Sequence, residues 1–279
     1  MKLISLIVVF MITVFTLSAQ EMSDLSIFQT FMEYAKKENL KEMKNCKRIE
    51  KIAKYFVNTP YVGGTLEADG PEKLQVNFRG LDCTTFVENV LALNLTIKAS
   101  SQDFDTFKSK LKFIRYRDGV LNGYPSRLHY ASDWIYNNHK KGLVKVVSTG
   151  KISNTLSIKV DYMSTHPESY PALKNNPDFV SRIAENEKQI SHLIFKYVPK
   201  NKVDKVNHYI KSGDIIAITT NIAGLDFSHL GFAVVDGDEI VLLLHASSTF
   251  KKVMLSNDSL FDYLAGVKRH TGIVIVRPL

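Results

Sequence analysis

"GLDCTTFVENVLALNL", residues 80–95, is the stretch that decides how the rest of this chain is interpreted. Its apolar residues Phe86, Val90 and Leu93 recur at helical spacing. Asp82, just before them, is of a residue type that caps the N-terminus of a helix. We therefore predict a helix that begins at Cys83, one of only two cysteines in the sequence.

A cysteine at the start of a helix is either a small apolar residue or a nucleophile. A thiol attacks as the thiolate, and its ordinary pKa of about 8.5 leaves little thiolate at neutral pH. The positive end of the helix dipole favours the thiolate, and a histidine that accepts the proton favours it further. A functional role for Cys83 therefore requires a histidine partner.

Two of the eight histidines lie in a pattern that could supply this partner. His229 begins the β-type run "HLGFAVVD" and His245 closes the run "EIVLLLHAS", with the hairpin signal "DGDE" between them. Antiparallel pairing places the start of one strand beside the end of the other, so we predict that His229 and His245 are neighbours at one end of a sheet. We interpret the other six as surface or structural residues: His129, His139, His166, His192, His208 and His270.

The remaining sequence predicts an α+β fold. Apolar periodicity predicts two amphipathic helices within residues 23–57, further helices within 103–140 and a helix over 177–200, whereas residues 142–160 have the composition of strands. From Lys211 onward, short β-type runs are separated by turn signals. Helices followed by a run of antiparallel strands are typical of the α+β class.

The N-terminus has the layout of a secretory signal peptide. "MKLISLIVVFMITVFTLSAQ" combines one lysine, an apolar stretch and small residues, which predicts cleavage after Ala19. A membrane anchor is the alternative, but the apolar run is shorter than the roughly 20 residues that a spanning helix needs. No linker or repeat divides the remainder. We therefore predict a signal peptide over residues 1–19 and a single exported domain over residues 20–279, without a stable membrane anchor.

The net charge of the protein does not by itself identify its binding partner. The formal net charge is +8 and the isoelectric point is about 9.2. Many basic proteins of this size bind nucleic acid, but the lysines here are scattered and no aromatic residues are interleaved with them for base stacking. Attraction to a polyanionic cell envelope explains the charge equally well. We expect no nucleic-acid partner.

Five short motifs identify a family resemblance. "TPYVGG", "GLDCTTFVE", "KSGDII", "SHLGFAV" and "LHASS" resemble, in order and spelling, the NlpC/P60 superfamily of cell-wall cysteine peptidases. The stretch "YPSRLHYASDWI" and the large middle segment are similar to one branch, the N-acetylmuramoyl-L-alanine amidase-like proteins. The resemblance implies a papain-like core of helices on a small antiparallel sheet, with an insertion at about residues 100–210. It also implies that Cys83 is the nucleophile, His229 the general base and His245 the residue that orients His229.

The resemblance further implies contacts to a substrate. Tyr61 matches a tyrosine near the active site, whose hydroxyl could stabilise an oxyanion together with the backbone N–H of Cys83. Asp82 is a helix cap, a substrate contact or both. In the branch-like stretch, Arg127 could pair with a carboxylate and Trp134 could stack on a sugar ring. The alternative for these two residues is a packed helix with Trp134 in the core.

The activity that the resemblance implies is peptidoglycan hydrolysis. The commoner reaction of the superfamily cuts between D-glutamate and a diamino acid of the stem peptide. Here the usual Ser-Gly pair after the cysteine is Thr84-Thr85, and the middle segment supplies extra walls. Both features favour cleavage between N-acetylmuramic acid and L-alanine, through a thioester at Cys83. A stem-peptide endopeptidase and a wall-binding module without turnover remain the alternatives.

The same resemblance sets the remaining expectations. We expect peptidoglycan or its muropeptide fragments as the only partner, a monomer, no cofactor, and a location in the periplasm or outside a bacterial cell. Cysteine and histidine are also zinc ligands, but the sequence has neither an HExxH motif nor a CxxC pair, so we expect no metal. Cys46 and Cys83 could form a disulfide in an exported protein, or they could be a reactive thiol and a spare one.

Overall fold

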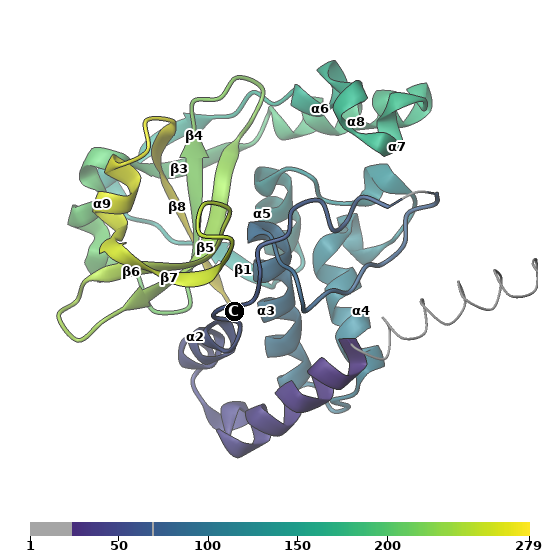
Figure 1. The fold of residues 1–279 in the computed structure, drawn as a ribbon. Helices are drawn as coiled ribbons and strands as arrows, with labels where there is room; N and C mark the ends of the chain where they lie inside the picture. Colours follow the sequence, from purple (N-terminus) through teal and green to yellow (C-terminus); the bar gives the residue numbers. More distant parts are fainter. Residues whose placement is uncertain (1–23, 69) are drawn as a thin grey trace, which may run out of the picture.

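The computed structural model describes residues 24–68 and 70–279. The predicted signal peptide, residues 1–19, lies outside this part of the chain, and its cleavage stays a prediction. The described residues form a mixed α/β fold in which helices cover an antiparallel sheet (Figure 1). None of their helices combines the length and the apolar character that crossing a membrane requires.

The helices that the sequence predicts before the sheet are present. Residues 24–37 form the first helix, and it is followed by α2 (Asn45–Tyr55), α3 (Cys83–Lys98), α4 (Phe104–Arg115) and α5 (Ala131–Lys140). Short 3-10 turns connect or follow them: η1 (Leu40–Glu42), η2 (Arg117–Gly119), η3 (Tyr124–Ser126) and η4 (Gly150–Ile152). The two helices predicted within residues 23–57 are therefore confirmed.

The helix α3 is the central helix of the fold and begins where the sequence predicts. The carboxylate of Asp82 accepts the backbone N–H of Thr85 at 2.8 Å, and the Thr85 hydroxyl accepts the backbone N–H of Asp82 at 2.9 Å. This reciprocal capping satisfies two backbone donors and starts the helix at Cys83. On the buried side, the ring of Phe86 meets Phe232 edge-on at 5.5 Å and joins α3 to the sheet.

The sheet follows the predicted β-type runs. Within the described residues it has eight strands in the order β2-β3-β8-β4-β5-β6-β7, and β1 pairs with β8 outside that path. The strands are β1 (Val144–Val146), β2 (Asn154–Ser157), β3 (Ile194–Pro199), β4 (Ile215–Thr220), β5 (Phe227–Val235), β6 (Val241–Ser247), β7 (Lys252–Ser259) and β8 (His270–Pro278). The predicted hairpin is confirmed, because β5 and β6 pair antiparallel from Val235 opposite Val241 to Phe232 opposite Leu244.

The middle segment, residues 100–210, differs from the prediction in one place. The predicted helix over 177–200 ends at Ile190 as α8 (Pro177–Ile190), and the next residues form the strand β3. In that strand Phe195 and Val198 are buried three residues apart, which is the helical spacing that the prediction followed. Backbone pairing with β2 and β8 holds these residues in a strand instead. The middle segment thus supplies β1, β2 and β3 to the common sheet.

Helices lie on both faces of the sheet and above one end of it (Figure 1). One face packs on α3 and α2, and the other face packs on α9 (Leu260–Ala265) and η6 (Lys200–Tyr209). The remaining elements gather at the top of Figure 1: α6 (Tyr162–Thr165), η5 (Pro167–Ser169), α7 (Pro171–Lys174) and α8.

Candidate active site

The N-terminal end of α3 adjoins a cavity of about 340 Å³. Cys83 is partly buried in its wall, and His229, at the start of β5, lines the same cavity. The backbone N–H of Leu230, the next residue of β5, lies on the same side of the site and acts to lower the pKa of Cys83. The fold therefore brings together a cysteine and a histidine that are far apart in the sequence. Cys46 lies on α2, and both thiols are free.

The two histidines are in contact, as the hairpin predicts. Nε2 of His229 and Nδ1 of His245 are 2.7 Å apart, and the two rings are nearly perpendicular. Within residues 24–68 and 70–279, Nδ1 of His229 has no hydrogen-bond partner, so it is the nitrogen available to exchange a proton. If His229 carries its proton on Nε2, Nδ1 of His245 accepts that proton in a hydrogen bond, and the tautomer of both rings is fixed.

Burial keeps the thiol of Cys83 and the imidazoles of His229 and His245 neutral in the free protein. It lowers the pKa of His229 to about 3, with a smaller contribution from His245, and lowers the pKa of His245 to about 4. Burial, followed by the charge of Asp82, raises the pKa of Cys83 to about 11. The helix start was expected to favour the thiolate, but desolvation outweighs it here. The resting site therefore contains a thiol beside a neutral imidazole.

Two candidate residues, Tyr61 and Asp82, lie by the chain that leads into α3, and of the two only Asp82 lines the cavity. Tyr61 is held in an extended segment, since its backbone N–H donates to the carbonyl of Lys251 at 2.9 Å and it bridges to Leu81. Burial raises the pKa of Tyr61, and Cys83 and Asp82 raise it further. One carboxylate oxygen of Asp82 caps α3, and Asp82 also lines the cavity, so capping does not exclude a substrate contact.

The two threonines after the cysteine have different roles. Thr84 lines the cavity, with its hydroxyl 4.0 Å from the Cys83 sulfur. Thr85 is buried and its hydroxyl is used to cap the helix with Asp82. Of the two threonines that replace the usual Ser-Gly pair, only Thr84 contributes to the cavity wall.

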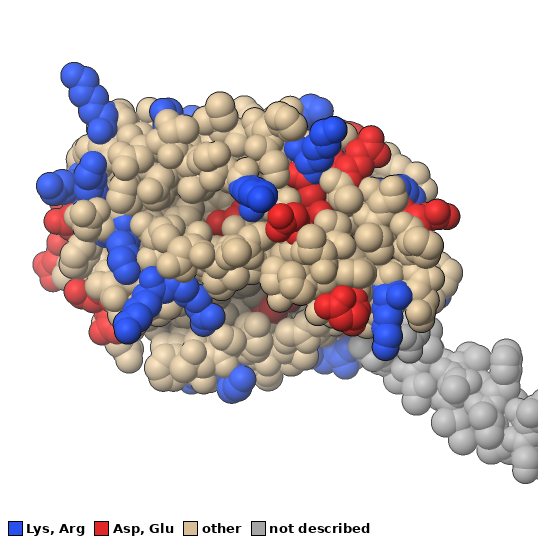
Figure 2. Space-filling model, turned by 90° about the horizontal axis from the view of Figure 1, so that it is seen from above, with Lys and Arg blue, Asp and Glu red and all other residues tan. Residues whose placement is uncertain are grey.

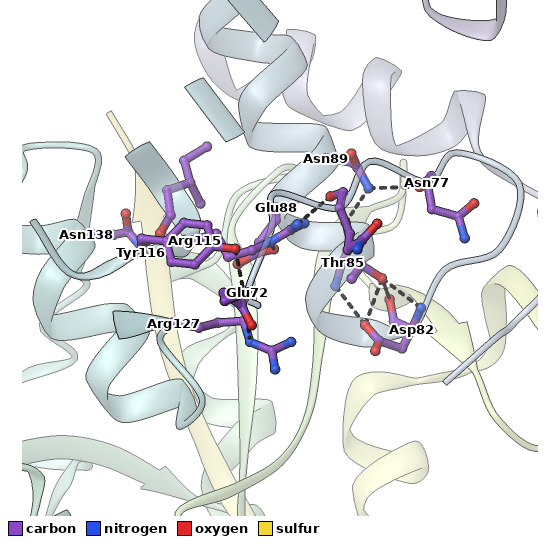
Figure 3. A network of polar contacts seen from close by, with 12 residues as sticks. Glu72, Asn77, Asp82, Thr85, Glu88, Asn89, Arg115, Tyr116, Arg127 and Asn138 are labelled. Atoms are coloured by element: carbon purple, nitrogen blue, oxygen red, sulfur yellow. Dashed lines mark hydrogen bonds and ion pairs between the residues drawn. The ribbon is translucent and has the colours of Figure 1, made fainter. Parts of the chain in front are cut away.

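Arg127 lines the cavity and already has carboxylate partners. Its guanidinium bonds to Glu67 at 2.6 Å and covers the ring of Tyr124 at 4.8 Å. It also lies 3.4 Å from Glu72 (Figure 3). Arg127 was predicted to pair with a substrate carboxylate. In the free protein Glu67 and Glu72 already occupy the guanidinium of Arg127, so a substrate carboxylate would have to displace one of them.

A second buried ion pair forms the cavity floor. Arg115 and Glu88 are almost fully buried and 2.7 Å apart, and both line the cavity (Figure 3). The hydroxyl of Tyr116 donates to Glu72 at 2.8 Å and links this pair to the carboxylates around Arg127. These contacts fix the floor because an unpaired charge would be costly at this depth.

Trp134 does not belong to the site. It is only 1% exposed, lies on α5 within the main apolar core and does not line the cavity. The alternative interpretation, a packed helix with Trp134 in the core, is therefore correct, and the prediction of a sugar-stacking face is wrong. The helical period of α5 turns Trp134 towards the core, and its sequence alone does not distinguish an inward from an outward face.

Several cavity residues were missed by the sequence analysis. His129, which we had interpreted as an ordinary histidine, lines the cavity and bonds through Nε2 to the carbonyl of Tyr124 at 2.9 Å. Asp226 accepts two hydrogen bonds from Ser132 at the start of α5 and thereby anchors the segment before β5. Met163, from the middle segment, forms part of another wall. No local sequence signal marks these residues, because tertiary packing alone brings them to Cys83.

The charge of the cavity differs from that of the surface. On the face shown in Figure 2, lysine and arginine side chains are spread among acidic ones. The cavity, in contrast, is lined by four acidic residues, Glu67, Asp82, Glu88 and Asp226, and by two arginines. Both arginines are paired, Arg115 with Glu88 and Arg127 with Glu67. In the part of the chain that the structure describes, no three histidine, cysteine or acidic side chains are arranged to hold a metal ion.

A larger hollow of about 1,350 Å³ lies elsewhere, between the helix of residues 24–37 and α4. Neither cysteine and none of the histidines lines it. The groups able to perform nucleophilic chemistry are in the smaller cavity, which we therefore take as the candidate active site.

Several solved structures resemble this chain over most of its length. The crystal structure of an N-acetylmuramoyl-L-alanine amidase from Bacteroides uniformis ATCC 8492 is 41% identical to this chain, with a TM-score of 0.79 over 84% of this chain and 99% of that one. A Bacteroides fragilis protein described as a candidate xylanase is 43% identical, with a TM-score of 0.76 over 81% and 99%. A Legionella pneumophila protein of the DUF1460 family is 25% identical, with a TM-score of 0.69 over 94% and 96%.

The family follows from the sequence match. No curated protein matches the sequence. A family profile described as AmiA-like, N-acetylmuramoyl-L-alanine amidase-like, matches residues 51–273, which include Cys83 and both histidines of the hairpin. The chain therefore belongs to the N-acetylmuramoyl-L-alanine amidase-like family.

Proposed function

We propose that this protein is a cysteine amidase that cleaves the bond between N-acetylmuramic acid and L-alanine in peptidoglycan fragments. The observation that carries the proposal is the hydrogen bond between Nε2 of His229 and Nδ1 of His245, with His229 and Cys83 lining the same cavity. A nucleophile, a base and a group that orients the base are the parts that such a reaction needs.

The resting protonation states define the first step. Because the pKa of Cys83 is raised and that of His229 is lowered, Nδ1 of His229 takes the thiol proton as the sulfur attacks the lactyl carbonyl. The backbone N–H of Cys83 and the hydroxyl of Tyr61 stabilise the oxyanion. The protonated His229 then gives its proton to the amine of L-alanine, which leaves. Water, activated by His229, hydrolyses the remaining thioester and restores the thiol.

The fold supports placing the protein among papain-like NlpC/P60 enzymes. In this proposal α3 is the cysteine-bearing helix, and β4 to β7 are the small antiparallel sheet of the core. The middle segment then supplies additional walls, through Arg127 and Met163 among others. Walls beyond the core suit a substrate with a sugar as well as a peptide. We also propose export through the predicted signal peptide, to the periplasm or the exterior of the cell.

Of the alternatives, a wall-binding module and a glycosidase have less support from the site than the amidase, whereas a stem-peptide endopeptidase has the same support. A stem-peptide endopeptidase would use the same Cys83 and histidines, so only product analysis separates it. A wall-binding module would not need a nucleophile with a hydrogen-bonded histidine pair. A glycosidase such as a xylanase needs two free carboxyl groups facing each other across the bond. In the cavity Glu88 is paired with Arg115, and Asp226 is held by Ser132.

Product analysis is the decisive experiment. The protein is incubated with a muramyl-tripeptide, and the products are identified by mass spectrometry. We expect free tripeptide and free N-acetylmuramic acid, and little reaction with the stem peptide alone. A fragment that contains the diamino acid, with L-Ala-D-Glu still on the sugar, would assign the protein to the endopeptidases instead.

The two histidines should be separable by substitution. His229→Ala is expected to lower kcat about a thousandfold, because it removes the group that transfers the proton. His245→Ala should lower kcat less, by roughly ten- to a hundredfold, because it removes only the group that orients His229. In His245→Asn an amide oxygen can replace Nδ1 as the acceptor, so most of that loss should be restored. A loss at His245 that equals or exceeds the loss at His229 would reverse the two roles.

A further inference from the structure

The ring of Tyr263, on α9, lies against the histidine pair. It meets His245 edge-to-face, with ring centroids 5.3 Å apart and planes at 74°. It also stacks on His270 of β8, with centroids 5.8 Å apart and planes at 29°. Tyr263 therefore contacts imidazoles on two different strands, one of which bonds directly to His229.

The position of Tyr263 is fixed independently of the active site. Leu260 and Leu264 are buried against the sheet, and Tyr263 shares their side of α9 because residues three and four apart lie on one helix face. The hydroxyl of Ser259 caps the helix by accepting the backbone N–H of Asp262 at 3.1 Å. Phe261 is 38% exposed and therefore turned away from this side.

His245 needs such a neighbour to keep its orientation. Its Nδ1 bonds to His229, but within the described residues its Nε2 has no hydrogen-bond partner. A rotation of the imidazole about its last torsion would replace Nδ1 by a carbon atom and break the bond to His229. An aromatic ring packed against the imidazole opposes that rotation.

We propose that Tyr263 is a positioning residue, whose ring holds His245 in the orientation that bonds to His229 and is itself supported by His270. The inference rests on the proposed amidase function, since it assumes that His229 acts as the base. The hydroxyl of Tyr263 has no part in the proposal, and within the described residues it makes no hydrogen bond.

Three substitutions on α9 test the inference through kinetics. Tyr263→Leu should lower kcat on a muramyl-tripeptide about tenfold and change KM less than about twofold, because the base is misoriented while the substrate walls are intact. Tyr263→Phe keeps the ring and should stay within about twofold of the unchanged protein. Phe261→Leu, on the exposed side of the same helix, is the matched control and should have no effect.

A spectroscopic measurement gives an answer that does not depend on the substrate. Nitrogen-15 spectra of the histidines should show one fixed tautomer for His229 in the unchanged protein and in Tyr263→Phe, and averaged tautomers in Tyr263→Leu. If the unchanged protein fails to cleave the muramyl-tripeptide, the proposed function is wrong, and these spectra still decide the role of the ring. If Tyr263→Leu does not fold, His270→Leu replaces it and should shift kcat and the spectra in the same direction.

Two results would overturn the inference. The first is a leucine variant with an unchanged kcat and an unchanged His229 tautomer, because the ring would then hold nothing in place. The second is a phenylalanine variant as impaired as the leucine variant, because the hydroxyl would then be the important group.

Discussion

Replacing Cys83 by alanine is expected to reduce turnover to background, a loss of about ten-thousandfold or more, while the protein remains folded. The substitution removes the atom that forms the thioester. Folding should survive because Asp82 and Thr85 cap α3 without using the sulfur. Turnover of a muramyl-tripeptide and the far-ultraviolet circular dichroism spectrum measure the two outcomes.

Cys46→Ala is the matched control, since Cys46 is also partly buried at the start of a helix but does not line the cavity. It should keep full activity. Near-normal activity in Cys83→Ala would exclude the cysteine mechanism. Alkylation at neutral pH is a weaker test, because a thiol with a pKa of about 11 presents little thiolate to the reagent before substrate binds.

The folded protein is expected to lose stability steeply as the pH falls below about 6.5. Burial lowers the pKa of His129 and His229 to about 3, and that of His245 and His270 to about 4. Between these values and the ordinary pKa near 6.5, the unfolded chain binds protons that the folded chain does not. Each group therefore lowers the free energy of unfolding by about 1 kcal/mol between pH 6 and pH 5.

Urea unfolding at pH 7, 6 and 5 and constant ionic strength measures this loss. The raised pKa values of buried carboxyl groups such as Glu88 and Asp226 act in the opposite direction, because the folded state then takes up their protons first. His270→Gln removes one of the four histidines and should make the dependence on pH shallower. A free energy of unfolding that does not change between pH 7 and pH 5 would contradict the buried, neutral histidines.

The parts of the site that the sequence predicts correctly depend on local signals. The cap at Asp82 and the start of α3 are encoded within a few residues, and the hairpin that joins His229 to His245 has its turn between two β-type runs. Such features form from neighbours in the chain, so periodicity and turn chemistry are sufficient to predict them.

The features that the sequence did not predict depend on contacts between distant residues. Arg127 meets Glu67 sixty residues away, and nothing near either residue indicates the pairing. The apolar spacing of α5 does not tell which face carries Trp134 into the core. The resting protonation of Cys83 was missed for the same reason, since burial is a property of the assembled cavity and not of the helix start.

The place of β8 in the sheet has a consequence for the order in which the fold can assemble. β8 pairs with β1 and β3 from the middle segment and with β4, which in turn pairs with the strand of His229. A chain interrupted before His270 would leave β3 and β4 each with an unpaired edge, open to pairing with other chains. The two halves of the sheet can therefore join only after β8 has been synthesised.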